Sequence, residues 1–245
     1  MRQRKKGPMV VIMALLLVSG IWGTGWASET DQQKTTAQIP QAAKKTNIMK
    51  YDETARGVNA PIYDYYAQQI KTKTGITKGI CLDVGCGGGY LGLALAKITD
   101  LDFIFLDISP EAIERARVHI IEDGLRKRAR TITADVHTIP LPDGSVDLVI
   151  SRGSIHFWKD PAAALKEIYR VLAPGGRTYV GGGKGTPAIQ AQIKAKLKAM
   201  GREKEWFDKG PGQRLQRDYD AIMKSAGISD YTIIGDDGFW IVMRK

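Results

Sequence analysis

The sequence is poor in cysteine, because only Cys81 and Cys86 occur among its 245 residues. Two thiols do not supply the four ligands of a structural zinc site, and a disulfide between residues so close in sequence would need particular geometry. We therefore expect two free thiols and no metal centre.

The sequence also lacks an apolar run of the roughly 20 residues that a membrane-spanning helix prefers. The apolar run at residues 9–22 follows a basic start at residues 2–6 and precedes a small-x-small pattern at residues 25–27. This order predicts a secretory leader, residues 1–27, that is cleaved before Ser28. An uncleaved N-terminal anchor is the alternative.

The remainder divides into a linker and one domain. Residues 28–47 are polar and show no apolar periodicity, which predicts a flexible linker. Residues 48–245 suit a single domain. The leader predicts a periplasmic, secreted or membrane-anchored protein, whereas translation from Met49 would leave the domain in the cytoplasm. The sequence carries no signal for an oligomeric state.

Positive charge exceeds negative charge, but the excess is scattered. The formal net charge is +10, of which the basic start of the leader supplies four. A further cationic cluster has the spacing of a solvated helix face and comprises Lys194, Lys196, Lys198, Arg202 and Lys204. Nucleic acid is therefore not an expected partner, and a membrane is expected only through an uncleaved leader.

A glycine turn at residues 85–89 separates a short apolar run from an apolar helical pattern. The run ends on a carboxylate, Asp83. Glycines permit positive φ and let a ligand approach the main chain, and the helix start behind the turn offers free N–H groups. The turn therefore predicts a site for a small molecule.

Short apolar strands alternate with helical patterns from residue 79 onward. Strands are expected at residues 80–84, 103–106, 131–134, 146–150 and 177–180, and helices at 90–98, 110–124, 161–172, 187–200 and 214–226. Ser109 and Asp160 have the positions of N-caps. The alternation predicts a mostly parallel sheet covered on both faces, and two β-rich runs at 231–234 and 239–243 predict a terminal antiparallel hairpin.

Three acids, Asp83, Asp107 and Asp135, fall at the ends of successive predicted strands. Ligands of doubly wound sheets bind outside the carboxyl ends of the strands. The pattern Gly-x-Gly-x-x-Gly at residues 87–92 formally matches a dinucleotide site, with Asp107 available for ribose hydroxyls. Asp83, however, would repel a pyrophosphate on the turn and attract an ammonium group. The charge pattern favours a cationic ligand.

Four motifs occur in order over residues 79–183: LDVGCGGGYLG, LDISPEAIERA, ADVHTIPLPDGSVDLVIS and ALKEIYRVLAPGGRTYVGGG. In this series the chain resembles the class I S-adenosylmethionine-dependent methyltransferases, particularly the small-molecule branch often called type 11. The resemblance implies a three-layer Rossmann-like α/β sandwich with a mostly parallel seven-stranded sheet and an antiparallel C-terminal hairpin. It also implies S-adenosylmethionine as methyl donor and an unidentified small-molecule acceptor.

The resemblance implies roles for single residues. Asp83 would interact with the methionyl ammonium, Asp107 would accept both ribose hydroxyls, and Asp135 would receive the adenine amino group. Ile108 and Val136 would flank the adenine, and Ser151 would border the methyl-transfer site. The turn would line the methionine and ribose portion through Gly85, Cys86, Gly87 and Gly89.

The acceptor side is less defined. Methyl transfer from a sulfonium depends mainly on positioning and on exclusion of water, so a base is needed only if the acceptor loses a proton. His156 is the candidate base, with a packed or surface histidine as the alternative. Arg152 could bind an anionic acceptor or pair with a local acid. Trp158 could wall an aromatic or cationic acceptor or pack on the next helix, and Tyr63 could belong to a lid or pack at the domain edge.

Two other functions stay open at this point. A non-catalytic S-adenosylmethionine-binding protein would keep the pocket without turnover. A nucleotide-dependent oxidoreductase would use the glycine pattern for a dinucleotide. The leader also conflicts with a cofactor that is made in the cytoplasm, unless translation begins at Met49 or the exported protein meets its ligand outside.

Overall fold

The computed structural model describes residues 51–204 and 217–245. The predicted leader, the predicted linker and Met49 lie outside these residues, as does the beginning of the helix predicted at residues 214–226. Within the described ranges, no helix combines the length and the apolar character needed to cross a membrane.

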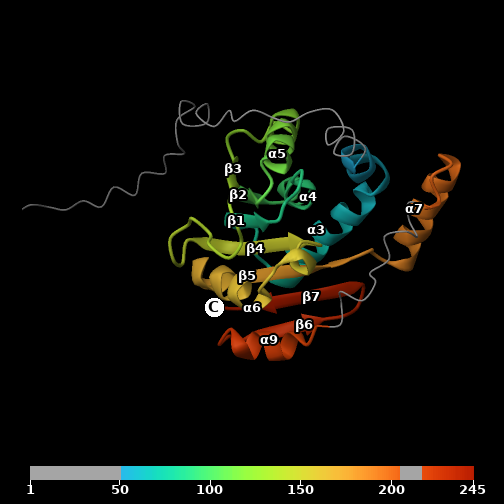
Figure 1. Cartoon of the computed structure of the whole chain (residues 1–245). Helices are drawn as coiled ribbons and strands as arrows, with labels where there is room; N and C mark the ends of the chain where they lie inside the picture. The colour runs from blue at the N-terminus through green and yellow to red at the C-terminus, as the bar shows by residue number, and fades with distance from the viewer. Residues whose placement is uncertain (1–50, 205–216) are drawn as a thin grey trace, which may run out of the picture. The chain divides into compact units, whose positions relative to one another are not determined.

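A seven-stranded sheet lies at the centre of the described domain (Figure 1). Its strands are β1 (Lys78–Val84), β2 (Asp100–Asp107), β3 (Ala129–Thr133), β4 (Val146–Arg152), β5 (Leu172–Gly183), β6 (Tyr231–Ile234) and β7 (Gly238–Met243). They are ordered β3-β2-β1-β4-β5-β7-β6, and β7 runs antiparallel to both of its neighbours. The predicted parallel sheet with a reversed terminal hairpin is thus confirmed.

Helices cover both faces of this sheet, as Figure 1 shows. One apolar core joins α3 (Ala60–Thr74), α4 (Tyr90–Ala96) and α5 (Pro110–Glu122) to one sheet face, and α7 (Pro187–Ala199) contributes two side chains to it. The other core joins α6 (Pro161–Val171) and α9 (Tyr219–Ser225) to the opposite face. Neighbouring strand residues such as Cys81 and Leu82 belong to different cores, because side chains alternate along a strand.

The predicted caps form as expected. The Ser109 hydroxyl accepts the backbone N–H of Ala112, and the Asp160 carboxylate accepts that of Ala163. Each cap satisfies one of the free N–H groups at a helix start. Two short helical turns, η1 (Thr54–Val58) and η2 (Ile155–Phe157), precede α3 and α6 along the chain.

Candidate active site

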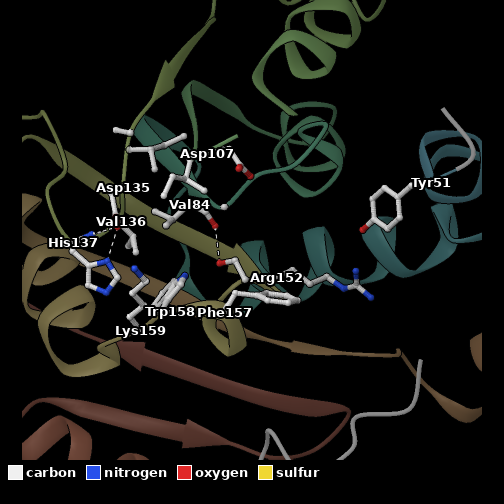
Figure 2. Close-up of a pocket in the computed structure, with 16 residues that line it drawn as sticks. Tyr51, Val84, Asp107, Asp135, Val136, His137, Arg152, Phe157, Trp158 and Lys159 are labelled. Atoms are coloured by element: carbon white, nitrogen blue, oxygen red, sulfur yellow. Dashed lines mark hydrogen bonds and ion pairs between the residues drawn. The ribbon is translucent and has the colours of Figure 1, made fainter. Parts of the chain in front are cut away.

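A cavity of about 410 Å³ opens at the carboxyl ends of β1, β2 and β4 and is also lined by the loop after β3. Figure 2 shows Asp135, His137 and Lys159 together at one end of it and Tyr51 at the other. A smaller cavity of about 60 Å³ shares Tyr51 and Arg152 with the first one and reaches down to Asp83. The two cavities thus share part of their walls, and together they are called the cleft below.

The glycine turn forms part of the wall between the two cavities. Gly85 has a φ of +62°, and a Cβ at this position would lie 2.3 Å from Cβ of Ser154, so a larger residue would collide. Gly87 has a φ of +56°, and its N–H donates to Oδ2 of Asp107 over 2.8 Å. The turn is therefore held against the end of β2 with its main chain close to the cleft.

Asp83 is the penultimate residue of β1 and is only 1% exposed. Burial raises the pKa of its carboxyl to about 7; the Gly92 N–H, which donates to Oδ2 over 3.0 Å, opposes this shift, and the charge of Asp107 adds to it. When hydrogen bonding offsets so little of the cost of burying a carboxylate, a cationic ligand group stabilises its charged form. The small cavity is therefore suited to an ammonium.

Arg152 also lines the small cavity. Its Nη2 donates to the Gly183 carbonyl over 2.8 Å, and its guanidinium carbon lies 4.9 Å from the centre of the Tyr63 ring. Its Nε is buried and has no hydrogen-bond acceptor among the described residues. A carboxylate and a guanidinium with a spare donor thus line one small cavity, which fits the ammonium and carboxylate of an amino acid.

Asp107 and Asp135 line the large cavity, as expected for two strand-end acids. Oδ1 of Asp107 accepts the Ser109 N–H over 2.9 Å, in addition to the Gly87 contact on Oδ2. Asp135 accepts the backbone N–H and the ring Nδ1 of His137, and the backbone bond contributes most to lowering the pKa of this carboxyl. Asp135 is therefore ionised at neutral pH.

Apolar side chains flank these two acids in the large cavity. Ile108 is 68% exposed although it is a large aliphatic residue, and Val136 is buried. An exposed isoleucine beside a strand-end acid offers a surface for a planar ring. The predicted adenine neighbours are therefore both present in the lining.

Two predicted residues are not brought to the cleft. Ser151 is fully buried, and its hydroxyl lies 2.6 Å from that of Ser154, which is the serine in the cavity wall. His156 is missing from the described lining of both cavities; its Nε2 lies 3.8 Å from the place of a Cβ on Gly182. His156 is partly buried, and its role as a base stays a prediction.

The remaining predicted residues do lie in the walls. Trp158 is buried and lines the large cavity, whereas Tyr63 is buried in α3 and lines the small one. Cys86 lines the small cavity, and burial raises the pKa of its thiol well above the usual value, which excludes a thiolate nucleophile at neutral pH. Cys81 and Cys86 are both free, as expected.

Other lining residues were not predicted from the sequence. Ser154, Lys159 and Tyr90 lie in the cleft, and His137 contacts Asp135 there. Lys159 and His137 follow the strand ends by several residues. The length of such a loop does not predict the direction in which its side chains point. The adjacency of His137 to Asp135 was the one available signal.

A seven-stranded sheet with a reversed seventh strand, strand-end acids and a glycine turn defines a Rossmann-like nucleoside-binding domain of the methyltransferase type. A family model described as a methyltransferase domain matches residues 82–180. A crystal structure from Methanococcus maripaludis, assigned as an S-adenosyl-L-methionine-dependent methyltransferase, is 38% identical with a TM-score of 0.73. The match covers 85% of this chain and 96% of that one. The chain belongs to the class I S-adenosylmethionine-dependent methyltransferases.

Curated relatives match over the same region. The 2-methyl-6-phytyl-1,4-hydroquinone methyltransferase 1 of Oryza sativa subsp. japonica is 36% identical over 96 residues, which are 39% of this chain and 28% of that protein. The ubiquinone biosynthesis O-methyltransferase of Aeromonas salmonicida is 32% identical over 99 residues, 40% of this chain and 41% of that protein. The matches thus span less than half the length of these two relatives.

Proposed function

We propose that this domain transfers the methyl group of S-adenosylmethionine to a small-molecule acceptor by in-line displacement. The observation that carries the proposal is the row of Asp83, Asp107 and Asp135 along one cleft beside the glycine turn. When bound, S-adenosylmethionine supplies an electrophilic methyl group on a positively charged sulfur. The chain itself has to bind this cofactor, orient the acceptor and exclude water.

The cleft offers a partner for each polar part of the cofactor. Asp83 would hold the ammonium and Arg152 the carboxylate at the small cavity. Asp107 has its two oxygens at the end of β2, where ribose hydroxyls would donate to them. Asp135 would accept from the adenine amino group, with Ile108 and Val136 against the ring.

The acceptor would lie against aromatic side chains at the rim of the large cavity. Phe157 is 73% exposed and Tyr51 is 52% exposed, and both line this cavity with the buried Trp158. Exposed aromatic side chains around a cleft are suited to stacking on a ring. Together with relatives named for a hydroquinone and for ubiquinone biosynthesis, this rim supports an aromatic acceptor that carries hydroxyl groups.

The described lining of the cleft bears on the protonation state of the acceptor. A neutral phenol needs a base when it attacks, and His156 is missing from the described lining of the large and the small cavity. An acceptor that arrives as a phenolate needs no such base. We therefore propose a phenol or hydroquinone acidic enough to ionise near neutral pH.

Two measurements test the function in turn. Calorimetric titration with S-adenosylmethionine and S-adenosylhomocysteine tests the cofactor, and folded protein that binds neither at about 1 mM would rule the proposal out. Radiolabelled S-adenosylmethionine with a panel of phenols, catechols and hydroquinones then tests the acceptor. Binding without transfer to any member of a broad metabolite panel would favour the second candidate, a non-catalytic cofactor-binding protein.

For cellular location, we propose export directed by residues 1–27. The support is the order of basic start, apolar run and small-x-small pattern in the sequence. Under this proposal the cofactor has to be available outside the cytoplasm, which makes the true N-terminus a decisive observation.

A further inference from the structure

His137 contacts Asp135 in the large cavity, and the proposed chemistry gives it no role. Its backbone N–H donates to Oδ1 of Asp135 over 2.9 Å, and its ring Nδ1 contacts the same oxygen (Figure 2). The side chain of His137 is 22% exposed, whereas that of Asp135 is 46% exposed. A partly buried ring therefore lies against one oxygen of a carboxylate that still faces the cavity.

The carboxylate determines which ring nitrogen carries a proton. The pKa of Asp135 is lowered, chiefly by the backbone N–H of His137 and then by its ring, so the carboxyl is ionised and its oxygens only accept. The contact with Nδ1 then requires a proton on this nitrogen, because two acceptors would repel each other. This requirement holds for a neutral ring and for an imidazolium.

The other ring nitrogen holds the ring at the start of α6. Nε2 of His137 lies 3.1 Å from the carbonyl oxygen of Asp160 and 3.3 Å from its backbone nitrogen. A protonated Nε2 donates to the carbonyl and a bare Nε2 accepts the N–H, so the ring is held in either state. Asp160 is itself fixed, because its carboxylate caps α6. The imidazole thus joins the loop after β3 to a helix start.

These contacts leave one oxygen of Asp135 for a ligand. Both contacts from His137 end on Oδ1, and no described residue donates to Oδ2. Because an ionised oxygen only accepts, it fits an amino group and disfavours a carbonyl oxygen at the same place. Oδ2 can therefore distinguish two purines that differ in this group.

We propose that His137 is a positioning residue for nucleobase recognition, which fixes Asp135 so that Oδ2 accepts from the 6-amino group of a purine and rejects a 6-oxo group. The ring N–H keeps the carboxylate from rotating, and the contact with Asp160 keeps the ring in place. Without the ring, the backbone N–H alone holds Oδ1, and the direction of Oδ2 is less well defined. The identity of the base as the adenine of S-adenosylmethionine rests on the proposed function, whereas the proton on Nδ1 does not.

A pair of ligands that differ at one position tests this role. S-Adenosylhomocysteine carries the 6-amino group, and S-inosylhomocysteine carries a 6-oxo group in its place. Calorimetry with the wild type is expected to give the amino ligand an advantage of about tenfold or more, as for a hydrogen bond to a charged group. A residue that only packs changes both affinities equally, whereas a residue that positions Asp135 changes their ratio.

Three variants separate the ring N–H from packing. His137→Phe keeps a ring but removes both nitrogens, and the advantage of the amino ligand is expected to fall about threefold or more. His137→Asn places an amide N–H near the position of Nδ1 and is expected to restore most of the advantage. Thr138→Ala changes an exposed neighbour in the same loop, outside the cavity lining, and is expected to match the wild type.

The effect of His137→Phe has to pass through Asp135. In Asp135→Ala the advantage of the amino ligand is expected to be lost, and adding His137→Phe to this variant is expected to change the ratio no further. A ratio in His137→Phe equal to that of the wild type would overturn the proposal. An equal effect of His137→Phe with and without Asp135 would overturn it as well.

A measurement without ligand keeps the proposal testable if neither nucleoside binds. The chain has three histidines, so ¹⁵N spectra of histidine-labelled protein can be assigned by substitution. At about pH 8, Nδ1 of His137 is expected to be protonated in the wild type, since the carboxylate selects this position, and to lose that preference in Asp135→Ala. A bare Nδ1 in the wild type would contradict the proposal, whereas folded protein that binds neither nucleoside would contradict the proposed function alone.

Discussion

Replacing Asp83 by asparagine is expected to stabilise the ligand-free protein and to weaken cofactor binding at the same time. The reason is that the carboxyl is almost completely buried, with a pKa raised to about 7, whereas an aspartate in the unfolded chain has a pKa of about 3.9. Between these two values the unfolded chain has released the proton and the folded protein has kept it. Rising pH therefore lowers the stability of the wild type.

The magnitude follows from this interval. Each pH unit between the two pKa values costs the wild type about 1.4 kcal/mol relative to the asparagine variant, which does not titrate. From about pH 5 to about pH 8 the difference in unfolding free energy is expected to grow by about 3 kcal/mol, and above pH 8 to stay constant. The cofactor is expected to reverse the order of stability, because its ammonium would stabilise the carboxylate and not the amide.

Urea unfolding of both proteins at several pH values measures this difference. Asp218→Asn is the control, since Asp218 caps α9 away from the cleft and asparagine caps equally well. Calorimetry at about pH 8 should show at least about a hundredfold loss of S-adenosylhomocysteine affinity in Asp83→Asn, as expected when one partner of a buried charge pair is removed. A stability difference that does not change with pH would refute a buried, protonated Asp83.

Three further predictions concern the rest of the cleft and the leader. Arg152→Met is expected to weaken S-adenosylhomocysteine about tenfold or more but not methylthioadenosine, which lacks the amino-acid part; equal losses in a competition assay would exclude the carboxylate contact. Phe157→Ala is expected to raise the KM of a phenolic acceptor without changing the Kd of the cofactor. Ile121 is an exposed residue on α5, and Ile121→Ala is expected to change neither constant. If both variants raised the KM equally, an acceptor site at Phe157 would be contradicted. Mass spectrometry of the native protein is expected to find Ser28 at its N-terminus, and a start at Met49 would exclude export.

The strand-end acids could be predicted because they depend on local sequence and on one general rule. Where a short apolar strand precedes a capped helix, the sequence pattern shows where the strand ends. Parallel strands bring their carboxyl ends to one edge of the sheet. Asp107 and Asp135 accordingly line the large cavity, and Asp83 the small one. The terminal antiparallel hairpin followed from the two β-rich runs, and the number of strands followed from the family resemblance. The order of the strands was not predicted.

The side chains beyond the strand ends could not be predicted in the same way. β4 continues to Arg152, so Ser151 still points into the domain and the wall of the cavity begins only at Ser154. The turn η2 directs His156 toward Gly182. Neither the length of β4 nor the direction of η2 has a signature in the sequence.

His119 shows a second limit of sequence reasoning. It lies among the buried residues of α5 with Ile113, Ala116 and Ile120, so by periodicity it is a core residue. Its polar partners, Gly88 and Asp52, come from distant parts of the chain. Only the folded chain shows that two acceptors face one ring.

The two hydrogen bonds on Asp107 also reduce the conformational entropy that this side chain loses when a diol binds to it. One oxygen is held by the Gly87 N–H and the other by the Ser109 N–H, so both side-chain torsions are fixed when the domain folds. Freezing a mobile side chain at the moment of binding costs about 0.5–1.5 kcal/mol. A diol that reaches this carboxylate therefore meets a preorganised acceptor. The selectivity of Asp107 for a diol arises from the fixed spacing of its two oxygens rather than from charge alone.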